Sequence, residues 1–254
     1  MHVLLTGASS GIGESLARAM ARDSANITLV ARRKDELERV ARSIGDRAKV
    51  QVLPCDLSQL DELEGLVKRA EDGVGPVEVL VNNAGLERVA RTTDVPIAEG
   101  EKLLRVNLLA PLRLIQMLIP GMAKAGMGRI VNVTSVAGLT PMPYATHYSA
   151  SKAALSSASE HLRHELAPLG IRVLTVYPGP IVTPMGERAA ASYEVDALPR
   201  MFWGSADGLA NAVVRSLDRG CARLIYPRAY SVVKWFPGLS RWVMFRFAPP
   251  PHKA

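Results

Sequence analysis

Short apolar runs that alternate with longer amphipathic segments constrain the fold of this chain more than any other feature. The runs are rich in Val, Ile and Leu and are apolar on both faces, as in strands of a parallel sheet that is buried on both sides. The expected strands are HVLLTG (2–7), NITLVA (26–31), KVQVLPCD (49–56), VEVLVNNAG (77–85), GRIVNVTS (128–135) and IRVLTVYPG (171–179). The expected helices lie near residues 13–22, 34–44, 60–70 and 97–119, and a last one begins near Tyr148. Because strands alternate with helices, the sequence predicts a doubly wound α/β fold, a parallel sheet with helices on both faces.

One domain of this class accounts for the whole chain. Its 254 residues include 48% hydrophobic and 22% charged residues, which is ordinary for a globular protein with a full core. No repeat or linker interrupts the pattern, so we expect a single domain over residues 1–254, with a core over 1–220 and a C-terminal extension over 221–254. Since the first strand begins at Val3, we expect no leader peptide and a cytoplasmic location.

The composition argues against several other classes of protein. The only two cysteines, Cys55 and Cys221, lie far apart in the sequence, which favours reduced thiols over a disulfide framework or a metal cluster. No stretch reaches about 18 uninterrupted apolar residues, so we expect no transmembrane helix. Although the net charge is +7, the first 220 residues contain no basic run with interleaved aromatic residues, so we expect no nucleic-acid partner.

A glycine-rich turn follows the first expected strand and opens the first helix. Gly7, Gly11 and Gly13 stand in TGASSGIG, where missing side chains let the backbone approach a pyrophosphate held by the amides of the helix N-terminus. The spacing is G-x-x-x-G-x-G and differs from the G-x-G-x-x-G fingerprint of many dinucleotide sites. A plain strand-to-helix turn is the alternative. In a doubly wound chain we interpret the turn as a Rossmann-type dinucleotide site.

Two arginines follow the second expected strand. A chain that binds NAD places Asp or Glu there, about 20 residues after the glycines, to hold the ribose hydroxyls. This chain has Ala31, Arg32 and Arg33 instead. Guanidinium groups bind phosphate through paired hydrogen bonds, and without a carboxylate no negative charge repels a 2′-phosphate. The residues therefore favour NADPH, with a solvated turn as the alternative.

A tyrosine and a lysine lie four residues apart at the start of the last expected helix. Tyr148 and Lys152, in YSASK, therefore share one face of that helix. An ammonium beside a phenol favours the phenolate and lowers a pKa that is ordinarily about 10, which makes the phenol a usable proton donor. The alternative is a packed ring beside a solvated ammonium.

Taken together, these motifs resemble those of the short-chain dehydrogenase/reductase family over residues 1–215. TGASSGIG resembles the cofactor turn of that family, CDLS places Asp56 at its adenine contact, NNAG at 82–85 resembles the segment beside the adenosine, and YPGPIVT resembles the segment at the nicotinamide end. The resemblance implies NADP(H) as the cofactor, bound by Gly7, Ser9, Ser10, Gly11, Ile12, Gly13, Arg32, Arg33, Asp56, Leu57, Asn83, Ala84, Gly85, Tyr148, Lys152, Pro178, Gly179, Ile181 and Thr183.

The resemblance also implies four catalytic residues, which are Asn107, Ser135, Tyr148 and Lys152. Tyr148 would give its proton to a substrate carbonyl oxygen, while Lys152 lowers the pKa of the tyrosine and holds the ribose hydroxyls. Ser135 would polarise the carbonyl, and Asn107 would help to hold a water for a proton relay. We therefore expect an NADPH-dependent oxidoreductase that reduces a ketone to an alcohol and forms a homodimer or homotetramer. A cofactor-binding sensor or scaffold with negligible turnover is the alternative.

The loop after the sixth expected strand covers the substrate in that family. Here it spans residues 184–204 and ends in LPRMFW, which contains Leu198, Met201, Phe202 and Trp203. An apolar lid of this kind indicates a lipophilic ketone or alcohol as substrate. The same side chains also suit a loop that simply buries itself.

Two histidines on the last expected helix have the spacing of metal ligands. His161 and His164 lie three residues apart beside Glu160 and Glu165, so all four side chains are candidates for one metal site. Both histidines lie well past the YSASK turn, on a helix that packs against a partner subunit in related enzymes. We therefore expect no metal.

The last 34 residues depart from the pattern of the rest of the chain. They hold seven of the thirteen Phe, Trp and Tyr residues and six Lys or Arg residues, but no Asp or Glu. Basic and aromatic residues in short helical pieces, broken at Pro237 and Gly238, are typical of a segment that binds a membrane surface. A subunit contact and an extra apolar cap on the sheet are the alternatives.

Overall fold

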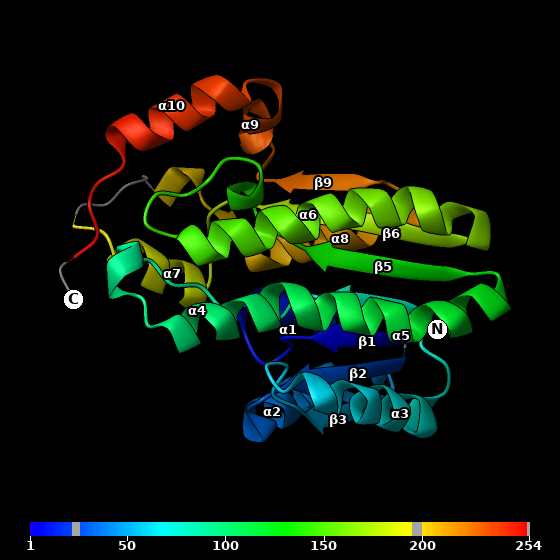
Figure 1. Ribbon diagram of the computed structural model, residues 1–254. Helices are drawn as coiled ribbons and strands as arrows, with labels where there is room; N and C mark the ends of the chain where they lie inside the picture. Colours follow the sequence, from blue (N-terminus) through cyan, green and yellow to red (C-terminus); the bar gives the residue numbers. More distant parts are fainter. Residues whose placement is uncertain (22–25, 195–199, 253–254) are drawn as a thin grey trace.

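A parallel sheet of seven strands forms the centre of the molecule (Figure 1). The structure is a computed structural model and describes residues 1–21, 26–194 and 200–252. The strand order is β3-β2-β1-β4-β5-β6-β9, and each neighbouring pair is parallel. The strands are β1 (His2–Thr6), β2 (Asn26–Ala31), β3 (Val50–Pro54), β4 (Val79–Asn82), β5 (Gly128–Val133), β6 (Ile171–Pro178) and β9 (Arg223–Tyr226), and a separate short pair consists of β7 (Ile181–Val182) and β8 (Gly204–Ser205). The predicted doubly wound α/β fold is confirmed.

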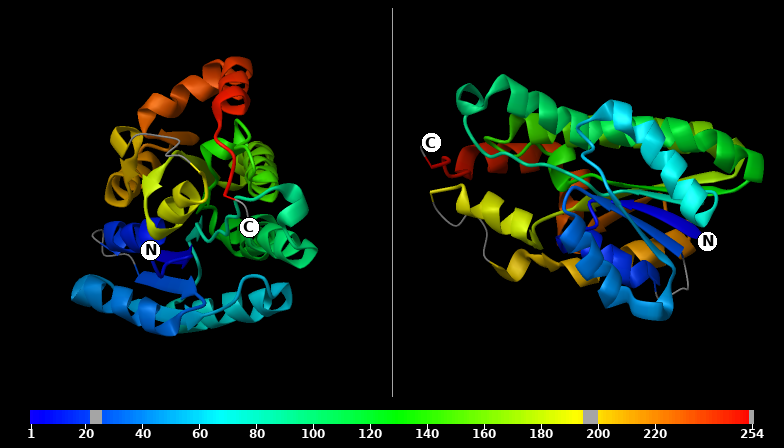
Figure 2. Two further views of the ribbon diagram at one scale, coloured as in Figure 1. Left: turned by 90° about the vertical axis from the view of Figure 1, so that its left-hand side faces the viewer. Right: turned by 90° about the horizontal axis from the view of Figure 1, so that it is seen from below.

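Helices cover both faces of the sheet (Figure 2). They are α1 (Gly11–Ala21), α2 (Lys34–Ile44), α3 (Leu63–Val74), α4 (Ile97–Leu104), α5 (Ala110–Ala125), α6 (Thr146–Leu166) and α8 (Ala206–Asp218). A shorter helix, α7 (Pro184–Ala191), follows β7, and two helices, α9 (Val232–Trp235) and α10 (Pro237–Phe247), follow β9.

Alternate side chains of each central strand belong to two separate hydrophobic cores. Val3 and Leu5 of β1 lie in the core formed with α1, α2 and α8, whereas Leu4 lies in the core formed with α3 and α5. All three side chains are fully buried. A strand that is buried on both faces must be apolar at every position, which explains the continuous apolar runs of the sequence.

The order of the strands reverses between β1 and β4. The chain leaves β1 toward α1 on one face of the sheet, and it leaves β4 toward α4 and α5, the latter packed on the other face. Such a switch point opens a crevice at the carboxyl ends of the strands, where doubly wound proteins bind their ligands. The glycine turn after β1 and the NNAG segment at the end of β4 both lie at this point.

The seventh strand lies in the segment that the sequence analysis placed outside the core. β9 pairs with the second half of β6, with Arg223 opposite Thr175 and Tyr226 opposite Pro178. Its RLIY run has only four residues and begins with an exposed arginine, so its pattern is too short to predict a strand. The sheet therefore extends to Tyr226, and the C-terminal extension begins at the next residue.

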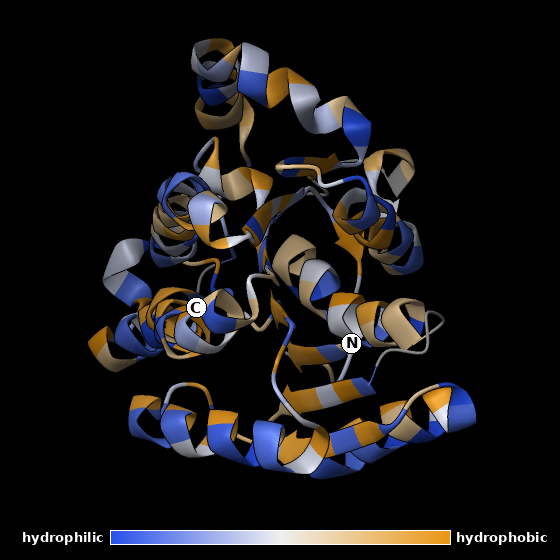
Figure 3. Ribbon diagram, turned by 90° about the vertical axis from the view of Figure 1, so that its right-hand side faces the viewer, coloured by the Kyte–Doolittle hydropathy of each residue, from blue (hydrophilic) through white to orange (hydrophobic). Residues whose placement is uncertain are grey.

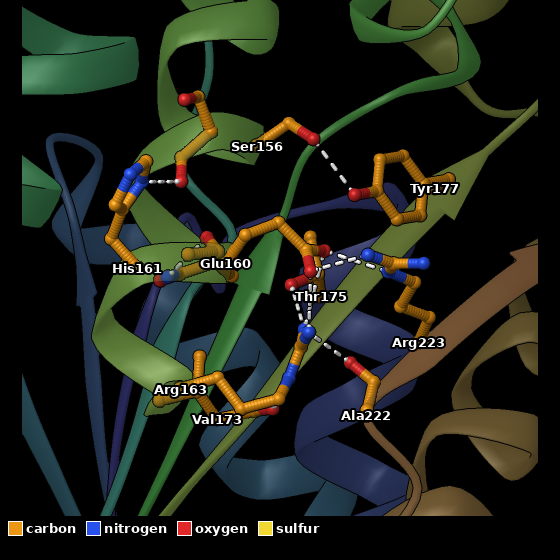
Figure 4. A network of polar contacts seen from close by, with 12 residues as sticks. Ser156, Glu160, His161, Arg163, Val173, Thr175, Tyr177, Ala222 and Arg223 are labelled. Carbon is orange, nitrogen blue, oxygen red and sulfur yellow. Dashed lines mark hydrogen bonds and ion pairs between the residues drawn. The ribbon is translucent and has the colours of Figure 1, made fainter. Parts of the chain in front are cut away.

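A polar network joins α6 to β6 and β9 (Figure 4). Arg163 of α6 donates hydrogen bonds to the Thr175 hydroxyl at 3.0 Å and to the Ala222 carbonyl at 2.8 Å. Glu160 accepts hydrogen bonds from Arg223 and Arg163. The bond from Arg223 and then that from Arg163 hold the pKa of Glu160 at about 2, against the opposing effect of partial burial. This network anchors the helix that carries the YSASK segment.

One helical stretch of the described residues, Ile97–Ala125, is long and apolar enough to cross a membrane by length and composition. It consists of α4, a π-helical turn over Arg105–Leu109 and α5. Leu114, Ile115 and Leu118 of this stretch are buried against the sheet. A helix that packs into a core needs this composition as much as a membrane helix does.

Candidate active site

A cleft of about 990 Å³ runs along the carboxyl ends of the strands, the edge that faces the viewer in the left panel of Figure 2. Predicted cofactor-binding residues that line it are Gly7, Ser9, Ser10, Gly11, Ile12, Gly13, Arg32, Arg33, Asp56, Leu57, Asn83, Ala84, Gly85 and Thr183. The other predicted cofactor-binding residues are not among its lining residues, and they are Tyr148, Lys152, Pro178, Gly179 and Ile181. The structure thus brings most of the predicted cofactor site to one cleft.

The glycine turn accepts no side chain at its two ends. Gly7 has a φ of +68°, and a Cβ atom there would lie 2.7 Å from the Cα atom of Ala84. A Cβ atom on Gly13 would collide with the carbonyl of Gly7. Asn83 holds the turn in place, because its side-chain amide donates hydrogen bonds to the carbonyls of Thr6 at 3.0 Å and Gly7 at 3.2 Å. The tight turn brings backbone amides of the α1 N-terminus to the cleft, as a bound pyrophosphate requires.

The two arginines after β2 lie at one end of the cleft. Arg33 donates hydrogen bonds to the hydroxyls of Ser9 at 3.2 Å and Ser10 at 3.4 Å, both in the glycine turn. Arg32 is exposed and lines the cleft beside it. These cations and hydroxyls form a donor set that suits a phosphate group, so the residues present fit a phosphorylated dinucleotide.

Asp56 lies at the end of β3, on the same side of the cleft. Its carboxylate accepts hydrogen bonds from the amide and the hydroxyl of Ser58 at 3.0 and 2.9 Å. Burial raises the pKa of Asp56, but the bonds from Ser58 and the charges of Lys102 and Arg32 outweigh this effect and hold the pKa below its ordinary value. Asp56 is therefore an ionised hydrogen-bond acceptor at neutral pH.

Ser135 and Tyr148 lie beside the cleft rather than among the residues that line it. Ser135 follows β5 and caps a short 3-10 turn, because its hydroxyl accepts a hydrogen bond from the Ala137 amide at 3.1 Å. Tyr148 lies in the first turn of α6, close enough to Ser135 for that side chain to lower the pKa of its phenol. Two hydroxyl groups this close together are candidates to contact the same carbonyl oxygen.

Lys152 and Asn107 lie directly beneath the NNAG segment. A Cβ atom on Gly85 would lie 3.5 Å from both the Nζ atom of Lys152 and the Oδ1 atom of Asn107. Lys152 is buried and donates a hydrogen bond to the Val133 carbonyl at 2.9 Å. Asn107 lies on the π-helical turn, a distortion that is frequent at functional sites. The four predicted catalytic residues are thus gathered from three elements.

The side chain of Asn107 is committed to the protein itself. Its Oδ1 atom accepts a hydrogen bond from the Leu86 amide at 2.8 Å, and its Nδ2 atom donates to the Leu86 carbonyl at 2.9 Å and to the Ser151 hydroxyl at 3.0 Å. Asn107 therefore positions the segment after NNAG and ties it to α6. Its expected role in holding a water stays a prediction.

The pKa of Tyr148 differs from the expectation. Burial raises it above its ordinary value, the charge of Glu87 raises it further, and only the hydrogen bond from Ser135 lowers it. Burial also lowers the pKa of Lys152 to about 8. The Lys152 ammonium is not among the groups that lower the pKa of the phenol. Its hydrogen bond goes to the Val133 carbonyl, and its Nζ atom is 5.9 Å from the centroid of the Tyr148 ring.

Glu87 is an acidic residue of this site that the sequence analysis does not contain. It lines the cleft two residues after NNAG, and its charge acts on both Tyr148 and Lys152. Burial raises the pKa of Glu87 to about 7, although Lys152 and Arg188 partly oppose this rise. Among the described residues it makes no hydrogen bond or ion pair, so its carboxyl group remains available to the cleft.

The loop over the site begins with α7. Thr183 caps this helix by accepting a hydrogen bond from the Gly186 amide at 3.1 Å, and Met185 and Arg188 line the cleft. Tyr193, just after the helix, donates a hydrogen bond to the Pro143 carbonyl at 2.9 Å. The loop is therefore attached to the segment that leads into α6. Ser135, Tyr148 and Lys152 lie beside the cleft and are not among the residues that line it.

The apolar end of this loop does not line the cleft. Met201 and Phe202 are exposed by 83% and 46%, and Trp203 lies against α7, where a Cβ atom on Gly186 would be 3.3 Å from its ring. Leu198 lies outside the described residues. Support for a lipophilic substrate must therefore come from other parts of the site.

The end of the chain returns to the same loop. The amide of Glu194 donates a hydrogen bond to the Pro250 carbonyl at 3.1 Å, and the His252 amide donates to the Ser192 carbonyl at 2.9 Å. Between these bonds Tyr193 forms an antiparallel bridge with Pro251. We call residues 250–252 the C-terminal strap, because they hold residues 192–194, directly after α7.

No group of three or more His, Cys, Asp or Glu side chains in residues 1–21, 26–194 and 200–252 is arranged to hold a metal. His161 is exposed, and its Nδ1 atom contacts the Ser157 carbonyl at 2.9 Å. Burial, with a smaller effect of Glu62, raises the pKa of the Cys55 thiol to about 11, so this cysteine is not a reactive thiolate.

Comparison with known proteins decides the family. The sequence model of a family described as short chain dehydrogenase matches residues 1–194. The chain belongs to the short-chain dehydrogenase family. The ketoacyl reductase HetN of Nostoc sp. is 34% identical to this short-chain dehydrogenase over 224 residues, which cover 88% of this chain and 77% of that protein.

Other members of the family agree. The fatty acyl-CoA reductase Rv0547c of Mycobacterium tuberculosis is 39% identical over 209 residues, which cover 79% of this chain and 68% of that protein. The solved structure of a short-chain dehydrogenase from Sphingobium yanoikuyae in complex with NADPH is 30% identical, has a TM-score of 0.82, and covers 100% of this chain and 98% of that chain.

Several residues of this short-chain dehydrogenase lie at the site without belonging to a predicted motif. Glu87 and Arg188 line the cleft, and Tyr193 attaches the loop. The ring of Tyr230, from the C-terminal extension, packs on Gly179, where a Cβ atom would lie 2.8 Å from it. Its place two residues after NNAG indicates that Glu87 lies near the expected cofactor site, but nothing in the sequence indicates that its charge acts on Lys152.

Proposed function

We propose that this short-chain dehydrogenase is an NADPH-dependent reductase that converts a ketone to an alcohol. The observation that carries the proposal is the grouping of Ser135, Tyr148, Lys152 and Asn107 beside Gly85 and Glu87, which line a cleft that also contains two arginines. Bound NADPH would supply a hydride to the carbonyl carbon. The residues of the chain would supply the proton and stabilise the charge on oxygen.

Tyr148 is the proton donor in this proposal. Its raised pKa keeps the phenol protonated at neutral pH, which suits a general acid. Ser135 donates a second hydrogen bond to the carbonyl oxygen and stabilises the charge that develops there. Lys152 supplies positive charge and, through its ammonium, holds the ribose hydroxyls of the cofactor.

Arg32 and Arg33 carry the preference for NADPH over NADH. The chain has no acidic residue at the end of β2 to hold a free ribose diol, and the hydroxyls of Ser9 and Ser10 lie beside Arg33. A 2′-phosphate placed among these groups would accept charge-assisted hydrogen bonds. Arg32 is exposed and lines the same cleft.

A lipophilic carbonyl compound is the proposed substrate. Apolar side chains line the cleft around Glu87, and they are Leu86, Val89, Val106, Met185 and Ala189. Two relatives are described as a ketoacyl reductase and a fatty acyl-CoA reductase, names that refer to substrates with an acyl chain. The proposal extends to a homodimer or homotetramer in the cytoplasm, which light scattering and fractionation would test.

Consumption of NADPH with a panel of carbonyl compounds tests the proposal directly. The panel contains a β-ketoacyl thioester, a long-chain aldehyde, an aryl alkyl ketone and a small polar ketone as the control. We expect oxidation of NADPH with at least one lipophilic carbonyl and a lower rate with the polar ketone. Tight NADPH binding without turnover of any member would instead favour the sensor or scaffold.

A further inference from the structure

The C-terminal extension presents an unusually apolar surface to solvent. Half of the exposed large hydrophobic side chains in the described part of the chain lie in α9, in α10 or between them, and they are Val232, Trp235, Phe236, Leu239, Trp242, Val243, Phe245 and Phe247. Trp235 is exposed by 71% and Trp242 by 59%. Such a concentration of apolar surface marks an interaction site in a folded protein.

Helix α10 has almost no covered face. Within the helix only Ser240 and Met244 are partly covered, and they lie one turn apart on the side toward the body. Figure 1 shows α9 and α10 as a layer of their own above α6 and β9, and Figure 3 shows hydrophobic and hydrophilic positions alternating along α10. The helix is therefore not a cap on the sheet, because its aromatic side chains point away from the core.

The charges of this surface are all positive. Arg228, Lys234, Arg241 and Arg246 are exposed, and the sequence contains no Asp or Glu after Asp218. The Nζ atom of Lys234 lies 5.2 Å from the centroid of the Trp235 ring, so a cation and an aromatic ring lie next to each other on the surface. Mixed tryptophan and basic side chains suit the boundary between lipid headgroups and acyl chains.

We propose that α9 and α10 form a docking surface for membranes that contain anionic lipids. Apolar burial and attraction between the basic side chains and the headgroups would act together. A second copy of this chain is a poorer occupant, because a symmetric contact would bring Lys234, Arg241 and Arg246 toward the same positive residues of its partner. Anionic lipid complements the surface in both charge and polarity.

The docking surface is connected to the active site at both of its ends. Before α9, Tyr230 packs on Gly179. After α10, the C-terminal strap holds residues 192–194 through two backbone hydrogen bonds. Docking would thus place the loop over the cleft next to the lipid, a position from which a lipid-dissolved substrate can enter.

Co-sedimentation with vesicles tests the docking surface without any measurement of activity. Full-length protein is mixed with vesicles of phosphatidylglycerol and phosphatidylcholine, or of phosphatidylcholine alone, at low and at high salt. We expect binding to the anionic vesicles at low salt and weaker binding in the other conditions. Protein that stays in the supernatant with anionic vesicles at low salt would overturn the proposal.

Two variants separate the apolar and the electrostatic contributions. In the first, Lys234→Gln, Arg241→Gln and Arg246→Gln are combined, and binding should weaken by about 100-fold, since each basic residue near an anionic surface contributes about fivefold. Its control combines Arg42→Gln, Lys124→Gln and Arg219→Gln, which removes the same charge from exposed positions of the body and should leave binding nearly unchanged. An equal loss of vesicle binding in both triple variants would overturn the proposal that α9 and α10 form the docking surface.

The second variant, Trp235→Ser with Trp242→Ser, removes two exposed rings and should abolish binding even at low salt. Sedimentation velocity without lipid tests the alternative that a second copy of this chain covers the surface. If this variant dissociates an oligomer that the unchanged protein forms, the surface is a subunit contact and the proposal is wrong. An unchanged oligomeric state together with lost vesicle binding would support it.

Discussion

The Nζ atom of Lys152 lies 5.9 Å from the centroid of the Tyr148 ring, one helical turn away, and donates its hydrogen bond to the Val133 carbonyl. The pair is close enough to share one site but not directly bonded. Burial therefore governs both groups, raising the pKa of Tyr148 and lowering that of Lys152 to about 8. The result is a neutral phenol beside a cation that can lose its proton in mildly alkaline solution.

Replacement of the phenol by a benzene ring tests its role as proton donor. Tyr148→Phe should lower kcat by about 100- to 10,000-fold, the usual contribution of a general acid. The affinity for NADPH should change little, because most of the predicted cofactor-binding residues line the cleft and Tyr148 does not. Stopped-flow measurement of turnover and fluorescence titration of NADPH would check both parts. Tyr226→Phe in β9 is the control, and activity of Tyr148→Phe close to that of this control would contradict the assignment.

Removal of the charge at Glu87 should change the pH profile in one direction. Above pH 7 its carboxylate is ionised and raises the pKa values of Tyr148 and Lys152. Glu87→Gln removes this effect, so the pH at which alcohol oxidation gains its phenolate base should move to a lower value. Below pH 7 the carboxyl group is neutral in the unchanged protein, and the two proteins should differ less.

The measurement for Glu87 is kcat/KM for alcohol oxidation as a function of pH. Glu101→Gln, at an exposed position of α4, removes the same charge outside the cleft and should leave the profile in place. A shift of the Glu87→Gln profile toward higher pH would contradict the electrostatic account.

The sequence predicts features that depend on neighbouring residues better than features that depend on residues far apart in the chain. Helix α2 has the predicted bounds, 34–44, because a strong amphipathic period and a following glycine are local signals. The glycine turn is local as well, since backbone conformation and close packing require those residues. The four-residue strand β9 is not determined locally, because it forms a strand only by pairing with β6.

The pKa values at the site show the same distinction more sharply. The spacing of Tyr148 and Lys152 places them on one helix face, but the sign of the effect on the phenol depends on burial and on Glu87, 61 residues earlier in the chain. The spacing of Tyr148 and Lys152 says nothing about the position of the Glu87 carboxylate. The motif therefore predicts which groups meet, and only the three-dimensional arrangement gives their protonation.

A carboxylate in place of Arg32 should reverse much of the preference for NADPH. Arg32→Asp removes a charge-assisted hydrogen bond and adds repulsion, which should weaken NADPH binding by about 10- to 100-fold. NADH should bind at least as well as before, because the new carboxylate can hold its ribose hydroxyls. Titration of both nucleotides, with Arg42→Asp on the exposed face of α2 as the control, provides the check. Equal affinities of the unchanged protein for NADPH and NADH would mean that the arginines are a solvated turn.

Loss of the charge at Glu160 should loosen the attachment of α6. Glu160→Gln weakens the bonds to Arg163 and Arg223 and should lower the free energy of unfolding at pH 7 by about 1–2 kcal/mol, a value reduced for partial exposure to solvent. The pKa of Glu160 is depressed in the folded state, so its stabilisation is present above pH 4.5 and is lost as the pH falls toward 2. Urea denaturation at pH 7 and pH 3 should thus show a smaller difference between the two proteins at the lower pH. A difference that grows on acidification would contradict this account.

Removal of the C-terminal strap should free the loop over the active site without unfolding the protein. A chain that ends at Ala248 loses the bonds that the Glu194 amide and the His252 amide make across the strap, each worth about 1 kcal/mol. Amide hydrogen exchange in residues 192–194 should accelerate, and KM for the carbonyl substrate should rise while NADPH affinity, set at the far end of the cleft, stays nearly constant. A chain that ends at His252 keeps the strap and is the matched control. If both truncated chains show the same exchange rates and the same KM, the strap does not position the loop, and the link between the docking surface and the site is lost with it.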